Sequence, residues 1–389
     1  MKVYKFKAYS KARDGVQDRL ITRFGLVRNY AVRMIERYYK QYGKPLTAFE
    51  LQSHIAKKKK VACRTTKLVE GLPSQAVQEC IGRVYKGLLN FFSYCKRKKS
   101  GNVEWRIRPP RCRKASHNKS YTLLQFGYKF DEGRNKVRIQ GKWYGFHKSQ
   151  EIKGKVKRLT IKRDRCGDIW FIVLTDWNDV QEIPMTGKAA GYDFGLKTFL
   201  TRHDGKQVAM PQFFKRNMKK LKRLQQKLSR KVNGSNNRRK ARLAVARLHR
   251  RIADCRNDWQ WKLANEIVRE FDIICIEDLN LEGMKLLWGR KVSDYGFAGF
   301  VAKLNYLAAK NGKEVRKVNR WLASSQTCHK CGYVNNGTKD LRLREWECPQ
   351  CGANHDRDEN AAKNILLAGT SASWRGSGKT KNSIEGLVA

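Results

Sequence analysis

Two cysteine pairs constrain the fold of this 389-residue chain more than any other feature of its sequence. Cys328 and Cys331 form one Cys-x-x-Cys turn, Cys348 and Cys351 form another, and sixteen residues separate the two turns. Unrelated thiols or a redox pair are the alternatives. Four thiolates at this spacing close a tetrahedron around one Zn²⁺ ion and leave no open coordination position. We therefore predict a structural zinc ribbon over residues 324–353.

The charge of the chain limits its partners. Lysine and arginine number 84 against 34 aspartates and glutamates, a formal net charge of +50. This excludes an ordinary metabolic enzyme with a small neutral substrate and predicts a polyanion partner. The 41% hydrophobic content still allows packed cores. No apolar run spans a bilayer and no signal-peptide core is found, so we expect no membrane partner and a cytoplasmic protein.

The periodicity of apolar residues changes several times along the chain, which predicts a mixed α+β, multidomain protein. Helical spacing dominates the first part, alternation follows, and the two mix thereafter. The predicted units are a strand at 1–9, a helical domain at 10–102, a β-barrel at 103–183 that strand 1–9 joins, a third unit at 184–323 with a basic helical hairpin at 212–256, the ribbon at 324–353, a C-terminal segment at 354–368 and a loose tail at 369–389.

Three acids occupy positions that suit divalent-metal ligands. Asp193 lies in Gly191-x-Asp193-x-Gly195, Glu277 ends a buried apolar run, and Asp358 opens a helix after the cysteines. Phosphodiester hydrolysis with two Mg²⁺ ions uses such acids from separate elements, because hard cations prefer carboxylate oxygens. Each acid also has an ordinary reading: Asp193 as a turn residue, Glu277 as half of a buried ion pair and Asp358 as a helix N-cap.

The basic hairpin is a predicted nucleic-acid-binding element. Residues 215–251 contain sixteen lysines and arginines and no acid, whereas solvated helix faces usually mix the two signs. We expect these charges to follow phosphates rather than only to aid solubility. The side-chain amides of Gln75 and Gln78 are candidates for reading base edges, or are ordinary polar helix positions. The basic candidates are Lys215, Arg216, Lys219, Lys220, Arg223, Arg230, Lys231, Arg238, Arg239 and Lys240.

The order of these features resembles the transposon-encoded TnpB family, relatives of type V CRISPR effectors. The chain presents the same features in the same order as that family: Asp193, the basic hairpin, Glu277-Asp278-Leu279-Asn280, the four cysteines and Asp358-x-Asn360-Ala361-Ala362-x-Asn364-Ile365. Leu72-Pro73-Ser74-Gln75-Ala76-Val77-Gln78 resembles its recognition helix. The similarity extends over about residues 1–367. The aromatic Tyr192 and Phe194 depart from the aliphatic residues usual beside the first acid, and we expect them to repack the strand without removing the ligand.

This resemblance implies an RNA-guided DNA endonuclease. Its expected parts are a helical recognition domain, a β-barrel wedge domain and a RuvC-like nuclease domain of RNase H type with an inserted four-cysteine zinc ribbon. Asp193, Glu277 and Asp358 match the catalytic positions of the family, which cleaves with Mg²⁺. A structured RNA from the transposon end and double-stranded target DNA beside a short flanking motif are the implied partners.

Three other functions compete with this one. A miniature type V CRISPR effector would take its guide from an array, and the genome beside the gene would distinguish it. A guided regulator would block DNA without cutting, which the intact acids disfavour. A cut-and-paste transposase shares the acid set, but the ribbon between Glu277 and Asp358 disfavours it.

Overall fold

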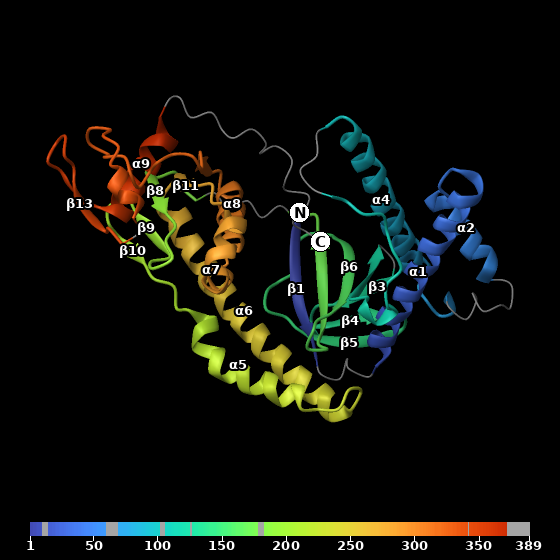
Figure 1. Cartoon of the computed structure of the whole chain (residues 1–389). Coiled ribbons are helices and arrows are strands. Elements are labelled where there is room, and N and C mark those ends of the chain that lie inside the picture. The colour runs from blue at the N-terminus through green and yellow to red at the C-terminus, as the bar shows by residue number, and fades with distance from the viewer. Residues whose placement is uncertain are drawn as a thin grey trace. The chain divides into compact units, whose positions relative to one another are not determined.

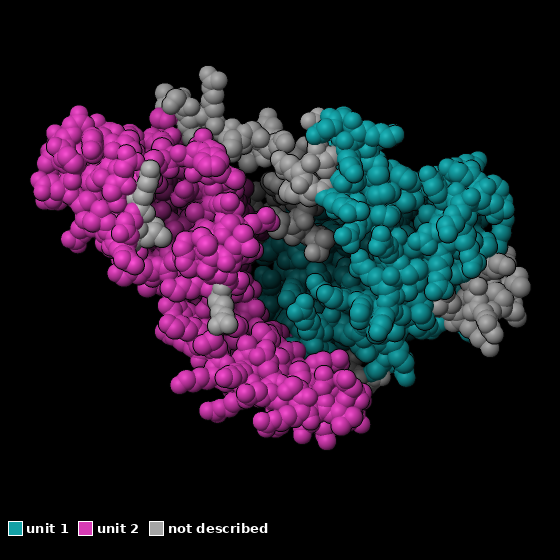
Figure 2. Space-filling view, viewed as in Figure 1, with its two compact units in different colours: residues 1–179 teal, residues 180–389 magenta. Residues whose placement is uncertain are grey.

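The computed structural model describes residues 1–9, 15–59, 69–101, 106–124, 127–177, 183–340 and 342–371. The chain divides into two compact units, residues 1–179 and 180–389, which Figure 2 colours teal and magenta. None of the helices in the described ranges combines the length and apolar character of a bilayer span.

In the described part of unit 1, three α-helices follow the first strand. They are α1 (Val16–Tyr42), α2 (Ala48–Lys59) and α4 (Ser74–Lys99). In α1 the buried residues recur at three- and four-residue steps, as predicted, so one face of the helix is apolar. Thr47 and Glu50 form a capping box at the start of α2: each backbone N–H donates to the side chain of the other residue, at 2.8 and 3.2 Å.

The seven-stranded sheet of unit 1 is barrel-like and nearly closed, with the order β2-β6-β7-β1-β5-β4-β3. β1 pairs antiparallel with both β5 and β7, so the first strand belongs to this sheet and the helices follow it in the chain. One apolar core joins the barrel interior to α1 and α4. The strands are β1 (Lys2–Ala8), β2 (Ser120–Leu124), β3 (Tyr128–Asp131), β4 (Lys136–Ile139), β5 (Lys142–His147), β6 (Val156–Arg163) and β7 (Ile169–Thr175).

A five-stranded mixed sheet forms the centre of unit 2, in the order β10-β9-β8-β11-β12. β8 (Ala189–Asp193), β11 (Ile273–Glu277) and β12 (Glu314–Val318) run parallel. β9 (Leu200–Arg202) and β10 (Gln207–Val208) extend the sheet antiparallel. This arrangement agrees with the mixed α+β nuclease fold that the resemblance implies.

Five α-helices complete the described part of unit 2. α5 (Phe213–Ser229) and α6 (Asn236–Glu270) form the predicted basic hairpin, and Leu221 packs between them against Leu248 and Ile252. α7 (Leu281–Tyr295) and α8 (Phe297–Lys310) lead from β11 to β12. α9 (Arg357–Thr370) follows the ribbon and runs beyond the expected limit at residue 368, while residues 372–389 of the predicted tail lie outside the described residues.

Glycines let α9 approach the sheet closely. A Cβ on Gly191 of β8 would collide with the Ala362 carbonyl and with Leu366 on α9. A Cβ on Gly369 of α9 would collide with the Cys275 side chain on β11. The helix is therefore fixed against the two strands that carry Asp193 and Glu277 (Figure 1).

Candidate metal and nucleic-acid sites

Asp193 and Glu277 lie at the same edge of the five-stranded sheet. Each is the last residue of its strand, and the two strands are adjacent and parallel. Tyr192 is in register with Ile276, so the two acids follow directly at neighbouring positions. The carboxyl ends of adjacent parallel strands are where open α/β sheets commonly carry functional groups.

Asp358 lies in the first turn of α9, near enough to Asp193 for its negative charge to raise the pKa of that acid. The N-cap of α9 is Asp356, whose side chain accepts hydrogen bonds from the backbone N–H groups of Asp358 and Glu359 at 2.9 Å. The alternative reading of Asp358 as the N-cap is therefore wrong. Its two oxygens instead lie 3.2 and 3.3 Å from the guanidinium of Arg344, a partner that no sequence signal indicated.

The electrostatics of this edge favour a bound cation. Burial raises the pKa of Asp193 to about 7, and the negative charges of Asp358 and Glu277 add to the increase. Burial also raises the pKa of Glu277, with a further contribution from Asp278. No ion pair of Glu277 is found among the described residues, in contrast to the alternative reading of this acid. Carboxylate oxygens are the ligands that Mg²⁺ prefers, but among the described residues Asp193, Glu277 and Asp358 do not lie close enough together to form a group that shares one ion.

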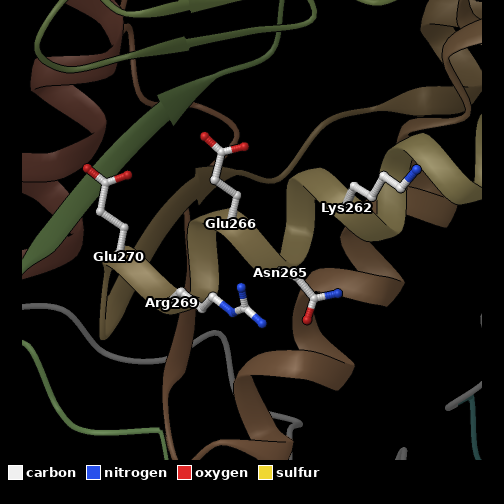
Figure 3. A pocket seen from close by; sticks show the side chains of 5 residues that line it. All are labelled: Lys262, Asn265, Glu266, Arg269 and Glu270. Carbon is white, nitrogen blue, oxygen red and sulfur yellow. The ribbon is translucent and has the colours of Figure 1, made fainter.

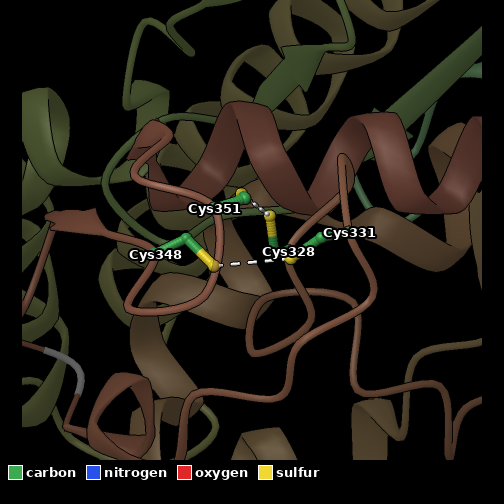
Figure 4. Close-up of side chains that lie close together, drawn as sticks. All are labelled: Cys328, Cys331, Cys348 and Cys351. Atoms are coloured by element: carbon green, nitrogen blue, oxygen red, sulfur yellow. Dashed lines mark hydrogen bonds between the residues drawn. The ribbon is translucent and has the colours of Figure 1, made fainter.

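The four predicted cysteines converge in unit 2 (Figure 4). Their sulfurs lie within 4.8 Å of one another, with Cys328 to Cys351 at 3.7 Å and Cys331 to Cys348 at 3.5 Å. A tetrahedron with metal–sulfur bonds of 2.3 Å has edges of about 3.8 Å, so the spacing fits one Zn²⁺ ion. Within the described part of the chain, these four cysteines are the one set of three or more His, Cys, Asp or Glu side chains that lie close enough together to bind one metal ion.

The short hairpin of β13 (Glu345–Glu347) and β14 (Asn354–Asp356) supports the second cysteine turn. Its Trp346 packs with Cys328 and Cys348 in a small apolar core. His355 Nε2 lies 3.1 Å from Cys328 Sγ, a contact that the cysteine spacing did not predict. A histidine four residues after the last cysteine was the available signal.

The basic hairpin exposes most of its predicted side chains. Eight of the ten basic candidates are exposed; they lie on α5, on the connection between the two helices or on α6. Arg238 is an exception, because its guanidinium donates to the carbonyls of Leu228 and Lys231 at 3.2 and 2.7 Å and closes the hairpin. Lys231 is the other partly buried member.

Unit 1 contains a basic cavity of about 750 Å³ between α1, α4 and the segment before β2. No acidic residue is found among the described residues that line it. Burial lowers the pKa of Arg28, and the nearby positive charge of Arg113 lowers it further. The positive charge of the cavity suits an anion. The sequence did not indicate this site, because its charged side chains come from separate segments of the chain. They are Arg28, Arg83, Arg108, Arg111, Arg113, Lys114 and Lys119.

Gln75 and Gln78 lie on the first turns of α4. Gln78 is exposed and Gln75 is half-buried. Their proposed role in base reading stays a prediction.

A second cavity, of about 630 Å³, lies along the C-terminal part of α6 in unit 2 (Figure 3). It combines acidic and basic side chains, and Glu270 pairs with Arg202 at 2.7 Å. The three candidate acids do not line it, so it is distinct from the predicted metal site. The lining residues are Lys262, Asn265, Glu266, Arg269 and Glu270.

Comparisons with known proteins agree with this architecture. A family model described as "Probable transposase" matches residues 172–287, and one described as "Cas12f1-like, TNB domain" matches residues 297–365. TnpB-like protein L79 of Acanthamoeba polyphaga mimivirus is 32% identical over 198 residues, 46% of this chain and 37% of that protein. The chain is related to the TnpB-like proteins. The predicted resemblance is thereby confirmed.

Two bacterial relatives extend the similarity. A "Putative RNA-guided DNA endonuclease" of Streptomyces pristinaespiralis is 41% identical over 224 residues, 57% of this chain and 54% of that protein. The "Putative RNA-guided DNA endonuclease InsQ" of Escherichia coli (strain K12) is 28% identical over 325 residues, 78% of this chain and 76% of the relative. The chain therefore spans about half the length of the Streptomyces relative.

Solved structures of two CRISPR nucleases align with most of the chain. The mini-RNA-guided endonuclease CRISPR-Cas_phi3 is 11% identical, with 94% of this chain and 91% of that chain covered and a TM-score of 0.49. The Cas12f1-sgRNA-target DNA complex gives 16% identity, 94% and 98% coverage and a TM-score of 0.36.

Proposed function

We propose that this chain is an RNA-guided DNA endonuclease that hydrolyses phosphodiester bonds with Mg²⁺. The observation that carries the proposal is the placement of Asp193 and Glu277 at the ends of adjacent parallel strands in unit 2, with the negative charge of Asp358 near enough to raise the pKa of Asp193. The relatives named as endonucleases support the same activity. In this proposal the nuclease domain comprises residues 184–323 and 354–368.

The three carboxylates hold the metal ions in this proposal. Two bound Mg²⁺ ions would polarise the scissile phosphate and lower the pKa of the attacking water. Asp193 and Glu277 are fixed by their strands, whereas Asp358 comes from α9 and is held by Arg344. Both oxygens of Asp358 face the guanidinium of Arg344, so this contact competes with a bound ion for the carboxylate.

The positive surfaces bind nucleic acid in this proposal. A guide RNA and the double-stranded target DNA supply phosphates for the basic hairpin at 212–256 and for the basic cavity in unit 1. Base pairing reads the target, and the recognition domain at 10–102 with the wedge domain at 1–9 and 103–183 reads a short flanking motif. Such a nuclease acts on DNA in the nucleoid of a prokaryotic cell.

The ribbon holds one structural Zn²⁺ ion. Four cysteine ligands leave no position for substrate, so the ion stabilises residues 324–353 and takes no part in cleavage.

A guide from a CRISPR array is the second candidate, favoured by the match to the Cas12f1-like domain over residues 297–365. Sequencing of the RNA that copurifies with the chain distinguishes the two sources. A species encoded beside the gene at a transposon end supports the first, whereas one derived from a spacer array supports the second.

Substitution of the acids tests the site. Asp193→Asn, Glu277→Gln and Asp358→Asn should each reduce DNA cleavage by at least about 10³-fold, because each removes part of several kcal/mol of transition-state stabilisation. Binding of RNA and DNA should remain. Glu314→Gln is the matched control, since Glu314 is exposed at the opposite end of the same sheet. Cleavage by Asp193→Asn at the wild-type rate would refute the assignment.

A further inference from the structure

Two asparagine side chains connect α9 to the first cysteine turn. Asn360 and Asn364 lie one helical turn apart and are only 1% and 7% exposed. Asp358 lies two residues before Asn360 in the same helix. A buried amide needs partners for both its oxygen and its nitrogen, so the contacts of these two residues indicate what α9 is fixed to.

Asn360 contacts both neighbours of Cys328. Its Oδ1 accepts a hydrogen bond from the His329 backbone N–H at 3.0 Å and lies 3.0 Å from His329 Nδ1. Its Nδ2 donates to the Thr327 carbonyl at 2.7 Å. The position of Cys328, between these two residues, is therefore coupled to the position of Asn360.

Asn364 extends the connection by one turn. Its Nδ2 donates to the carbonyls of Thr327 and Ser324 at 2.6 and 2.8 Å. The two amides thus bind residues 324–329 along one face of α9. Another part of the helix packs on β8, where Ala362 and Leu366 meet Gly191, two residues before Asp193.

We propose that Asn360 and Asn364 are positioning residues that link occupancy of the four-cysteine site to the placement of Asp358. The ion holds Cys328, the amides hold α9 to the Cys328 turn, and α9 carries the Asp358 carboxylate toward Asp193. The part of this inference that concerns Asp358 rests on the proposed nuclease function.

The linkage has two consequences. Residues that hold the ligand turns of a metal site usually change metal affinity 10- to 100-fold when they are substituted. Asn360→Ala leaves the His329 N–H and the Thr327 carbonyl without this partner, so Cys328 is held less firmly. It also loosens α9, so Asp358 binds Mg²⁺ less well and more Mg²⁺ is needed for cleavage.

The experiment uses the full chain with its copurified RNA. Transfer of Zn²⁺ to a chromogenic chelator measures zinc affinity, and single-turnover cleavage against Mg²⁺ concentration measures the Mg²⁺ requirement. For Asn360→Ala we expect zinc affinity to fall about 10- to 100-fold and the Mg²⁺ midpoint to rise severalfold, with target binding unchanged. Asn305→Ala is the matched control, because this exposed asparagine donates a hydrogen bond to the Val301 carbonyl of its own helix.

Asn364→Ala keeps both contacts with His329 and tests the same linkage if Asn360→Ala does not fold. It should change both quantities in the same direction but by less. Wild-type zinc affinity and a wild-type Mg²⁺ midpoint in both variants would overturn the inference. If the wild-type chain does not cleave DNA, the proposed nuclease function fails, whereas the zinc measurement still tests the contact between the amides and the cysteine turn.

Discussion

At the scale of single residues, a buried ion pair anchors the sheet of unit 2 at the end opposite the candidate acids. The Asp272 carboxylate lies 3.0 Å from Lys313 Nζ and accepts hydrogen bonds from the backbone N–H groups of Thr186 and Gly187 at 2.7 and 2.6 Å. Lys313 also donates to the Val268 carbonyl. Asp272 thus joins the residues before β8, the end of α6 and the start of β12.

Asp272→Ala should lower the free energy of unfolding by about 3–5 kcal/mol, because it leaves a buried ammonium group without its partner. Asp258→Ala removes an exposed ion pair with Lys262 and should cost less than about 1 kcal/mol. Urea unfolding followed by tryptophan fluorescence measures both. Equal decreases in the two variants would contradict this account.

The same pair predicts a pH dependence. Burial acts to raise the pKa of Asp272, but the hydrogen bonds from Lys313, Gly187 and Thr186 together outweigh it and hold the pKa below its ordinary value. A carboxyl group whose pKa is lower in the folded state than in the unfolded state stabilises the fold at pH values above its unfolded-state pKa, about 3.9. This contribution disappears as the pH falls through the folded-state pKa. Urea midpoints between pH 3 and 7 should therefore fall more steeply below about pH 4 in the wild-type chain than in Asp272→Ala. Parallel curves would contradict this.

The residues of the candidate sites differ in how far the local sequence pattern indicates them. Asp193 and Glu277 follow apolar strands, and the cysteine spacing is specific, so local pattern was enough for these. Arg344 beside Asp358 and the contacts of Asn360 depend on tertiary packing between the ribbon and α9, and pattern alone did not indicate them.

At the scale of elements, α9 depends on close packing with β8. Gly191→Ala should cost about 1–3 kcal/mol and move α9, because its Cβ meets the Ala362 carbonyl. DNA cleavage should fall with it, while RNA binding remains. Gly82→Ala on α4 adds a Cβ in open space and should be neutral or stabilising by up to about 1 kcal/mol. Thermal unfolding and cleavage rates measure the pair, and wild-type cleavage by Gly191→Ala would argue against this packing.

Elements with strong periodicity were predicted, and the others were missed. α1, α4 and the strand at Ile273–Glu277 have long apolar stripes or continuous apolar runs. β3 and β5 were not predicted, because they are short and combine lysines with aromatics and, in β5, a glycine. α7 was also missed, and its helical geometry is interrupted at Trp288.

At the scale of the whole molecule, the net charge of +50 should make nucleic-acid binding strongly salt-dependent. Replacement of Lys219, Lys220 and Arg223 by glutamate should reduce the slope of log affinity against log salt by about one for each phosphate that the hairpin no longer binds. Charge-preserving Lys219→Arg, Lys220→Arg and Arg223→Lys should keep the wild-type slope. Fluorescence anisotropy with labelled RNA at several salt concentrations makes the comparison. An unchanged slope in the glutamate variant would exclude these side chains from the interface.

The order of motifs and periodic segments along the chain, rather than any single motif, predicted how the whole molecule is organised. The alternating residues of the first strand indicated that it joins the barrel, whereas its neighbours in the sheet, β5 and β7, could not be named from the sequence. The basic cavity of unit 1 could not be predicted either, since it needs α1, α4 and the segment before β2 together.

Guided cleavage is the most direct test of the central claim. The chain is expressed from its native locus, its copurified RNA is sequenced, and cleavage of a duplex that matches the variable RNA segment is compared with cleavage of a mismatched duplex. We predict Mg²⁺-dependent cleavage of the matched duplex by the wild-type chain and none by Asp193→Asn. A heterogeneous mixture of cellular RNAs, or cleavage that ignores the match, would contradict the account.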